Sequence, residues 1–381
     1  MEKNTRIFDV MKKAGLDALI ACRQDTVAYC AGYDTPQEYG ATDNFIGGPF
    51  SYAFVDANQR KITLVVSAWG GANAETTFAD EIIPFDVFDF FGDVDCHGAQ
   101  QAALAKAVAA LKGAKKVGIE FTALPVQAYT ELLKLGCELV DAYPVLVESR
   151  KIKQPYEIER LRYICDIETY GMNCLMDMAR NFTGGTELEI FNRVIARMSE
   201  KHGKLVRETG DFATGPRSNK LSGVSPAINR EIQVGDSGIC DMSTRINGYC
   251  CDCANTVVFG AEPNAEQKQL FQIVRDAFNA AYEKLVPGNT FYQVDTAAKE
   301  MFNKYGKEPI VYTGHQLGTN VNEPPRIQCF ETDVIQPNMV VCIEPQNYTF
   351  DAGVTGVRLE HAVLITENGP ETLTPFKWGL E

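Results

Sequence analysis

The 381-residue sequence lacks any long apolar run, and this absence limits where the protein can work. No stretch approaches the ~20 apolar residues that a helix needs to cross a bilayer. The first residues, MEKNTRIFDVMKKAG, also lack the apolar centre of a signal peptide. We therefore expect a cytoplasmic protein with no membrane partner.

Basic segments and phosphate-binding loops are missing as well. The net charge is −14, and no run of Lys and Arg offsets it. Nucleic acids and anionic membranes attract basic surfaces, so we expect neither as a partner. Neither Gly47-Gly48 nor Gly70-Gly71 opens a helix in a glycine-rich nucleotide-binding pattern.

Cysteine is abundant, but the twelve cysteines are not spaced for a disulfide framework. Cys250 and Cys253 form a C-x-x-C pair, yet no second pair or histidine couple completes a tetrahedral zinc site. On a strand, Cys251 and Cys253 point away from the face that carries Asp252. We predict that these cysteines fill the core.

The length and the changing pattern along the chain predict two domains. Residues 1–145 alternate helices and strands, which predicts an α/β domain. Its helices are expected over 5–14, 100–111 and 125–135, and its strands over 17–22, 51–56, 61–67, 116–121 and 138–143. The polar stretch 148–154 suits a linker, and we place the boundary between residues 145 and 146.

The second domain, residues 146–381, begins with helices and ends with strands. Long helices are expected over 156–181, 188–202 and 265–285, followed by a helix that Thr290 and Gln293 open as a capping box. Apolar strands are expected around 310–313, 339–344 and 356–366. This order predicts an α+β domain.

Between these helices, residues 237–259 predict a β-hairpin. Asn247-Gly248 supplies the two positive φ angles of a type I′ turn. If Ile246 faces Tyr249 across the turn, Asp241 on the outgoing arm faces Ala254 on the returning arm.

That register brings Asp241 and Asp252 together, because Asp252 lies two residues from Ala254 on the same strand face. Their backbones are then diagonal neighbours, roughly 7–8 Å apart. Two like charges this close repel unless a cation lies between them. The pair predicts a hard-cation site, and two solvated aspartates on an exposed face are the alternative.

Three further candidate ligands follow the hairpin. His315 lies in YTGHQLGTNVNEPP, Glu344 in NMVVCIEPQNY and Glu360 in GVRLEHAVLIT. Both glutamates belong to apolar strands, where an unpaired carboxylate is costly to bury, although each alone is more often salt-bridged. Together with Asp241 and Asp252 they make four carboxylates and one imidazole, a set that suits two divalent cations.

The order and spacing of these positions resemble the creatinase, prolidase and methionine aminopeptidase family. The shared series is D-x₁₀-D, GH-x-x-G-x-x-x-x-E-P, VV-x-IEP and GVR-x-E-x-x-x-x-IT-x-x-G. The resemblance runs from about Val145 to the end, and residues 1–145 are similar to the N-terminal domain of prolidases and Xaa-Pro aminopeptidases. It implies an α/β N-terminal creatinase-like domain and an α+β pita-bread catalytic domain.

Residue by residue, the resemblance implies a dinuclear site. Asp241 and Asp252 would bind metal with Asp252 bridging, His315 and Glu344 would bind one ion, and Glu360 would bridge both. Two cations about 3.5–4 Å apart lower the pKa of a bridging water, which gives a hydroxide near pH 7. Glu344 is also placed to take a proton from that water. We prefer Mn²⁺, with Fe²⁺, Co²⁺ or Zn²⁺ as alternatives.

The chain departs from the family pattern on the substrate side. Prolidase-like members carry a second histidine seven residues after the GH motif, where this chain has Asn322. They also carry a histidine after an upstream Gly-Pro segment, and here Gly215-Pro216 leads to Ser222. Asn and Ser form hydrogen bonds but cannot carry a proton near pH 7. The candidate catalytic residues are Glu344, Asn322 and Ser222, and the candidate substrate contacts are Tyr249 and Arg326.

The remaining histidines do not replace the two that are missing. His97 lies in the first domain and His202 ends a helix. His361 follows Glu360 on the opposite strand face. We expect structural or solvated roles for all three.

Three functions fit these features. The first is a dinuclear metallohydrolase resembling Xaa-Pro dipeptidases and aminopeptidases, acting on a small peptide or amide. The second is a small-molecule hydrolase or lyase resembling creatinase, ectoine hydrolase or dimethylsulfoniopropionate lyase, because both substrate-side histidines are absent. Its acid, base and carboxylate contacts would come from residues such as Tyr249, Tyr312, Asp211, Arg217 and Arg326. The third is a non-catalytic binding protein, against which the intact ligand set argues.

The resemblance also implies a homodimer, in which the N-terminal domain reaches over the active site of the partner. In that arrangement residues 33–50, rich in glycine and aromatic side chains, would contribute substrate contacts. The alternative is an ordinary surface loop.

Overall fold

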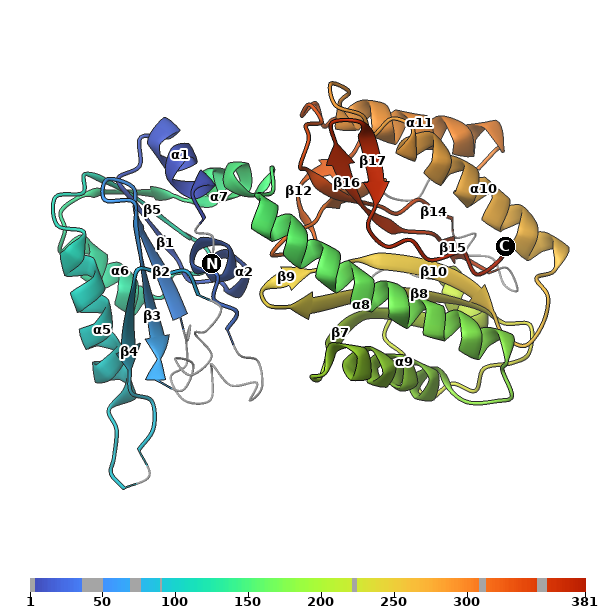
Figure 1. The fold of residues 1–381 in the computed structure, drawn as a ribbon, viewed down its shortest axis with the longest axis horizontal. Helices are drawn as coiled ribbons and strands as arrows, with labels where there is room; N and C mark the ends of the chain where they lie inside the picture. Colours follow the sequence, from blue (N-terminus) through green and yellow to red (C-terminus); the bar gives the residue numbers. More distant parts are fainter. Residues whose placement is uncertain are drawn as a thin grey trace. The chain divides into compact units, whose positions relative to one another are not determined.

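The structure is a computed structural model of the chain that describes residues 4–35, 51–68, 77–89, 91–220, 225–307, 313–347 and 355–381. It divides into two compact units, Met1–Arg150 and Lys151–Glu381 (Figure 1). The sequence placed the boundary after residue 145, which lies inside the helix α7 (Tyr143–Arg150). Most of the expected linker 148–154 is the end of α7 and the residues that lead into the next helix.

A six-stranded mixed sheet forms the centre of the first unit, in the order β4-β3-β2-β1-β5-β6. Its strands are β1 (Ala18–Ala21), β2 (Ser51–Asp56), β3 (Lys61–Ser67), β4 (Glu81–Phe85), β5 (Lys116–Ile119) and β6 (Glu138–Asp141). The sequence did not predict β4, which contains Pro84. Proline is tolerated there because β4 lies at the edge of the sheet, where a missing N–H removes no interior hydrogen bond.

Helices lie on both faces of this sheet (Figure 1). The helices α5 (Cys96–Ala110) and α6 (Val126–Leu133) pack on one face, where apolar residues such as Leu104 join strand residues in a single core. The helices α1 (Arg6–Lys13) and α2 (Gln24–Ala31) lie on the other side. Seven of the eight residues of α2 are buried. A helix buried nearly all round shows no amphipathic pattern, so α2 could not be predicted from the periodicity of apolar residues.

The second unit has two larger sheets with helices on their outer sides (Figure 1), and β14 pairs with β15 in a separate two-stranded sheet. The first sheet has the order β10-β8-β7, with β9 pairing to β8, and the second has the order β12-β11-β13-β16-β17. The strands are β7 (Arg207–Thr214), β8 (Ser237–Ile246), β9 (Tyr249–Cys250), β10 (Cys253–Val258), β11 (Gly314–Gln316), β12 (Glu323–Ile327), β13 (Val340–Ile343), β14 (Gln346–Asn347), β15 (Val357–Arg358), β16 (His361–Thr366) and β17 (Gly369–Thr372). The helices α8 (Pro155–Arg180) and α9 (Glu187–His202) line the first sheet, and α10 (Ala265–Tyr282) and α11 (Phe291–Lys304) line the second.

The predicted hairpin is confirmed together with its register. Asn247 and Gly248 have φ angles of 51° and 82°, as a type I′ turn requires. Asp241 on β8 faces Ala254 on β10. The returning arm is not one continuous strand, however, because the ladder is interrupted between β9 and β10. Asp252 lies in that interruption, outside both strands. The alternation of side chains along a strand therefore does not set the direction of its side chain.

The strands near the end of the chain also differ from those that the sequence predicted. Most of the strand expected over 310–313 lies outside the described residues, and the described strand β11 follows it directly. The strand expected over 356–366 is divided into β15 and β16. Glu360 lies at this division, immediately before β16. Two of the predicted ligands, Asp252 and Glu360, are therefore on irregular backbone between short strands.

The first turn of α8 contains a buried carboxyl group. Gln154 and Glu157 form a capping box, in which the Gln154 N–H donates to Glu157 Oε2 over 2.9 Å. The Tyr249 hydroxyl donates to Glu157 Oε1 over 3.1 Å. Burial raises the pKa of the Glu157 carboxyl to about 7, and these hydrogen bonds and the nearby Lys153 charge oppose the shift only in part.

This raised pKa predicts a pH-dependent difference between the wild type and Glu157→Gln. A carboxyl whose folded pKa lies above its unfolded value costs stability as the pH rises through the interval between them, here from about 4.5 to about 7. Glutamine removes that cost, so the variant should gain about 2 kcal/mol relative to the wild type between pH 5 and pH 7.5. Urea unfolding of both proteins at the two pH values measures the difference. An equal difference at both pH values would show that Glu157 does not titrate in this range.

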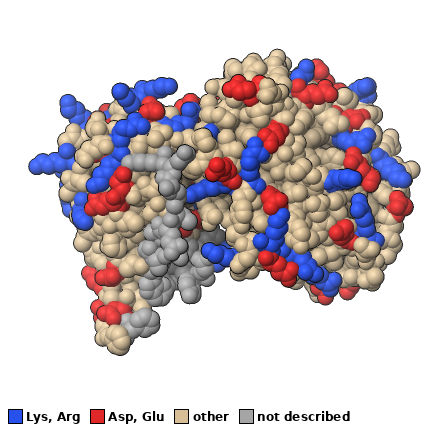
Figure 2. Space-filling view, in the orientation of Figure 1, with Lys and Arg blue, Asp and Glu red and all other residues tan. Residues whose placement is uncertain are grey.

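Charge is mixed over the surface of the described chain. In the view of Figure 2, Lys and Arg alternate with Asp and Glu. Surface ion pairs include Arg162 with Glu371 and Lys201 with Asp166. Among the described residues, no helix has the length and apolar character needed to cross a membrane.

Candidate metal centre

Four of the five predicted metal ligands converge around one imidazole nitrogen. His315 Nε2 lies 3.4 Å from Asp252 Oδ2, 3.4 Å from Glu344 Oε1 and 4.0 Å from Glu360 Oε1. All four side chains are buried. The structure therefore brings these four residues together, although Asp252 and Glu360 are 108 positions apart in the sequence.

Backbone hydrogen bonds between the two sheets hold the cluster. Ala254 and Glu360 exchange two such bonds, of 2.9 Å and 3.3 Å, so the segment before β16 is joined directly to β10. The Glu344 N–H donates to the carbonyl of Thr313 over 2.9 Å. The Ser243 hydroxyl donates to Asp252 Oδ1 over 3.0 Å. The ligands are thus positioned by main-chain contacts rather than by long flexible side chains.

Glu360 shows that the cluster fits a cation. Its side chain is 1% exposed, and neither carboxylate oxygen has a hydrogen-bond partner among the residues that the structure describes. Burial, and next to it the charges of Asp252 and Glu344, raise the pKa of Glu360 well above its usual range. An unpaired carboxylate costs several kcal/mol to bury. A divalent cation supplies the missing partner, and carboxylates with an imidazole are suitable ligands.

His315 responds to the same negative surroundings. Burial acts against a charged imidazole, but the hydrogen bond with Asp252 and the charge of Glu344 raise the pKa of His315 to about 9. Its Nδ1 atom lies 2.9 Å from the carbonyl oxygen of Gln316, which fixes the ring orientation. In the absence of a cation, the protonated ring carries the positive charge that the carboxylates require.

The fifth predicted ligand, Asp241, is held by Arg358. An Arg358 N–H donates to Asp241 Oδ2, and the same Nη1 atom lies 3.6 Å from Asp211 Oδ2. Asp211 is the partner of Asp241 on β7, so one guanidinium serves two facing aspartates. The Arg358 Nε atom donates to Gln346 Oε1 over 2.9 Å. Asp241 therefore makes an ion pair with Arg358 beside the cluster, and its role as a metal ligand stays a prediction.

Sequence reasoning missed Cys342. One ligand atom each from Asp252, His315, Cys342 and Glu360 lies within 4.8 Å of the others. Cys342 faces His315 in the pairing of β13 with β11, and its thiol donates to the backbone carbonyl of Asp252 over 3.5 Å. The available signal was its position two residues before Glu344, which places both side chains on one strand face.

Two candidate substrate-side residues lie beside the cluster. Arg326 on β12 is the register partner of His315 on β11. Arg326 is exposed, and its Nε atom donates to Asn322 Oδ1 over 2.9 Å. Asn322 and Arg326 thus form a polar pair at the strand that borders the histidine.

The other candidate substrate-side residues are placed differently. Tyr249 is fully buried, and its hydroxyl is bonded to Glu157 on α8, so a substrate contact by Tyr249 remains a prediction. Ser222 and Tyr312 lie outside the described residues. Of the loop at 33–50, only residues 33–35 are described.

His361 has the structural role that the sequence predicted. Its ring stacks on Trp378 with centroids 4.0 Å apart, and Nδ1 lies 3.1 Å from Thr374 Oγ1. Burial lowers the pKa of His361 to about 3, so the ring stays neutral. His361 is therefore a core residue next to Glu360 in sequence but not part of the cluster.

The hairpin cysteines also fill the core, as predicted. Cys251 and Cys253 are fully buried. Their thiols contact α8, with Cys251 Sγ 3.4 Å from Cys165 Sγ and Cys253 Sγ 3.6 Å from Glu168 Oε2. They point away from Asp252.

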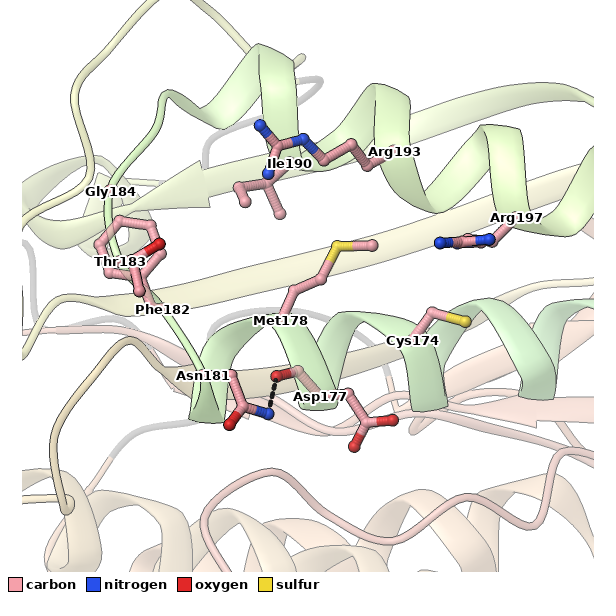
Figure 3. A pocket seen from close by; sticks show the side chains of 10 residues that line it. All are labelled: Cys174, Asp177, Met178, Asn181, Phe182, Thr183, Gly184, Ile190, Arg193 and Arg197. Atoms are coloured by element: carbon pink, nitrogen blue, oxygen red, sulfur yellow. Dashed lines mark hydrogen bonds between the residues drawn. The ribbon is translucent and has the colours of Figure 1, made fainter.

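A surface hollow of about 360 Å³ lies between α8 and α9, away from the cluster. Figure 3 shows Met178 rising from α8 between the two helices, with Arg193 and Arg197 on the α9 side. Its lining contains none of the predicted site residues. We assign it no part in the chemistry of the metal centre.

Two sheets that enclose a buried group of carboxylates and one histidine define a metal-binding catalytic domain, which here follows a separate α/β domain. The chain belongs to metallopeptidase family M24, which its sequence matches over residues 159–367. Residues 5–152 match the creatinase/prolidase N-terminal domain. The predicted fold, a creatinase-like α/β domain followed by a pita-bread domain, is confirmed.

Known relatives extend this similarity over the whole chain. An Xaa-Pro dipeptidase from Pyrococcus horikoshii is 27% identical over 377 residues, covering 98% of this chain and 97% of the relative. An Xaa-Pro dipeptidase from Pyrococcus furiosus is 33% identical over 232 residues, covering 60% and 65%. The crystal structure of the prolidase from Pyrococcus horikoshii OT3 has a TM-score of 0.78 at 26% identity, with 100% of both chains covered.

Proposed function

We propose that this protein is a metal-dependent hydrolase of a small peptide or amide, with Xaa-Pro dipeptides as the first substrate class. The observation that carries the proposal is the buried Glu360 carboxylate, which has no hydrogen-bond partner in the described ranges and lies beside Asp252 and His315. Membership of family M24 and the similarity to two Xaa-Pro dipeptidases support the substrate class.

Asp252, His315, Glu344 and Glu360 would hold the metal. Asp241 would join them as a ligand of a second ion once its pair with Arg358 opens. When bound, divalent cations lower the pKa of an attacking water and polarise the scissile carbonyl. These carboxylate-rich ligands, taken without any other donor, favour Mn²⁺, with Fe²⁺, Co²⁺ and Zn²⁺ as alternatives.

Glu344 is the residue that we assign to proton transfer. It lies at the end of β13, is 7% exposed and comes within 3.4 Å of His315 Nε2. From this position its carboxylate takes the proton of the attacking water and returns it to the leaving amine. Asn322 cannot share this task because an amide does not titrate near pH 7.

Arg326 and Asn322 would bind the far end of the substrate. The exposed Arg326 guanidinium suits the terminal carboxylate of a dipeptide, since this group accepts paired N–H donors. Asn322 holds the Nε edge of that guanidinium and so orients it. Ser222 is proposed as a further hydrogen-bonding group on the substrate side.

The direct test is hydrolysis of Xaa-Pro dipeptides by metal-loaded protein, with released proline as the readout. We expect turnover that stops when a chelator removes the metal and returns when metal is added back. Dipeptides without proline serve as matched substrates. Metal-loaded protein that releases no proline, yet converts a small carboxylated amide or a sulfonium compound, would overturn the proposed substrate class.

One observation favours a second candidate function, a small-molecule hydrolase or lyase of the same fold. Asn322 occupies the position where prolidase-like proteins carry a histidine. Its side-chain oxygen accepts a hydrogen bond from Arg326. A polar pair without a proton carrier suits a substrate that needs a charge contact rather than a second acid. The same panel of amides and sulfonium compounds tests this candidate.

We also propose a homodimer, as expected from the resemblance of the first unit to creatinase-like N-terminal domains. Light scattering of the purified chain measures its mass in solution. A mass of one chain at micromolar concentration would contradict this proposal without affecting the metal centre.

A further inference from the structure

We propose that Cys342 is a metal ligand, and that its thiolate directs the site toward Zn²⁺ or Co²⁺ rather than Mn²⁺. The proposal deepens the proposed function and depends on it in one respect, that the cluster binds a divalent cation. It changes the metal preference that the carboxylates alone would suggest.

The strand geometry places Cys342 on the cluster side of the second sheet. Cys342 and His315 are register partners on β13 and β11, and directly paired residues project to the same face of a sheet. Glu344 follows two residues later on the same face. Cys342 is fully buried, so its thiol cannot find a partner in solvent.

The ligand atoms are close enough for one ion to contact all of them. The Cys342 sulfur and one atom each from Asp252, His315 and Glu360 lie within 4.8 Å of one another. The hydrogen bond from Cys342 to the Asp252 carbonyl is 3.5 Å long, and a thiol is a weak donor. That contact therefore holds the sulfur in place only weakly.

Glu360 provides an independent indication that a cation binds at this point. Both of its oxygens lack hydrogen-bond partners in the described part of the chain, although the side chain is 1% exposed. Two buried cysteines of the hairpin, Cys251 and Cys253, contact α8 instead, and the thiol of a third, Cys250, contacts the Thr319 carbonyl. Cys342 is thus the cysteine that shares a compact group of donor atoms with an unpartnered buried carboxylate.

The chemistry of the four donors differs from that of an all-oxygen site. As the metal–sulfur bond forms, the thiol proton leaves to solvent, and no atom changes oxidation state. Two carboxylates, one imidazole and one thiolate give four ligands, the number that Zn²⁺ prefers in proteins. Thiolate ligands favour Zn²⁺ and Co²⁺ over Mn²⁺, which binds best to carboxylates and water.

Cobalt substitution tests the proposal with a readout that is independent of turnover. Co²⁺-loaded wild type is expected to show thiolate-to-cobalt charge-transfer absorption in the near ultraviolet. X-ray absorption should show a sulfur neighbour at about 2.3 Å from the metal. Both signals should disappear in Cys342→Ser and persist in Cys253→Ser, a matched variant of a buried cysteine on the hairpin. In competition, the preference for Zn²⁺ over Mn²⁺ should fall at least tenfold in Cys342→Ser.

Each outcome separates this proposal from the proposed function. Cobalt bound without a sulfur signal, or a signal that survives Cys342→Ser, would overturn the role of Cys342 and leave the hydrolase proposal standing. Wild type that binds neither Co²⁺ nor Zn²⁺ would overturn both. If Cys342→Ser does not fold, Cys342→Thr places a β-branched side chain, which strands favour, at this position, and the sulfur distance in the wild type still decides.

Discussion

Glu360→Gln is expected to weaken metal binding more than about 100-fold and at the same time to stabilise the metal-free protein. Removing one of a few metal ligands costs more than the 10- to 100-fold that is typical of residues behind the ligands. The metal-free protein gains because Glu360 is a buried carboxylate with no hydrogen-bond partner in the described residues, and glutamine has no charge to bury. Thermal unfolding with and without added metal measures both effects.

The expected changes in metal affinity and in the stability of the metal-free protein are large enough to be measured separately. Wild type should be stabilised by about 2.7 kcal/mol at a metal concentration 100 times its Kd, and Glu360→Gln should not respond at that concentration. His361→Phe is the matched control, since His361 is the next residue and stacks on Trp378 in the core. This variant should change stability but leave the metal response intact. Unaltered metal affinity in Glu360→Gln would show that its oxygens face no ion.

Glu344→Gln is expected to lower kcat by about 10²- to 10⁴-fold, the range that general acid–base catalysis supplies. Glutamine keeps a side-chain oxygen near His315 but cannot accept and return a proton. KM should change much less, because Arg326 and Asn322 rather than Glu344 are proposed to bind the substrate. Steady-state kinetics with the Xaa-Pro dipeptide that the proline-release assay identifies as a substrate measures kcat and KM separately.

A second buried glutamate controls for the loss of charge. Glu168 on α8 is fully buried and accepts a hydrogen bond of 2.9 Å from the Thr244 N–H, but it is not in the metal-ligand group. Glu168→Gln should leave kcat unchanged. If Glu344→Gln retained most of its kcat with metal bound, another residue would have to move the proton.

Local backbone rules explain why the hairpin could be predicted. Asn247-Gly248 adopts positive φ angles that few other pairs accept, and this fixes the turn and thereby the register. With a side-chain period of two, the register decides which face each aspartate occupies. The same reasoning predicted that Cys251 and Cys253 fill the core, where the structure shows them in contact with α8. Neighbours within one hairpin could thus be deduced residue by residue.

Contacts between distant segments could not be deduced in this way. The sequence contains no local signal that Arg358 reaches Asp241, because the two residues meet only when β15 is placed beside β10. Cys342 was overlooked for a related reason, since its pairing with His315 depends on the order of strands in the second sheet. The interruption that frees Asp252 from the ladder is likewise set by packing between the two sheets.

The most direct test of the metal-dependent hydrolase is elemental analysis of protein purified without added metal. About two divalent ions per chain are predicted for the full ligand set, and Asp252→Ala and Glu360→Ala should each lose them. The stoichiometry also shows whether the ion pair between Asp241 and Arg358 opens to admit a second ion. A folded wild type that holds no divalent ion, even after incubation with Zn²⁺, Co²⁺ and Mn²⁺, would contradict the metal centre and the hydrolase with it.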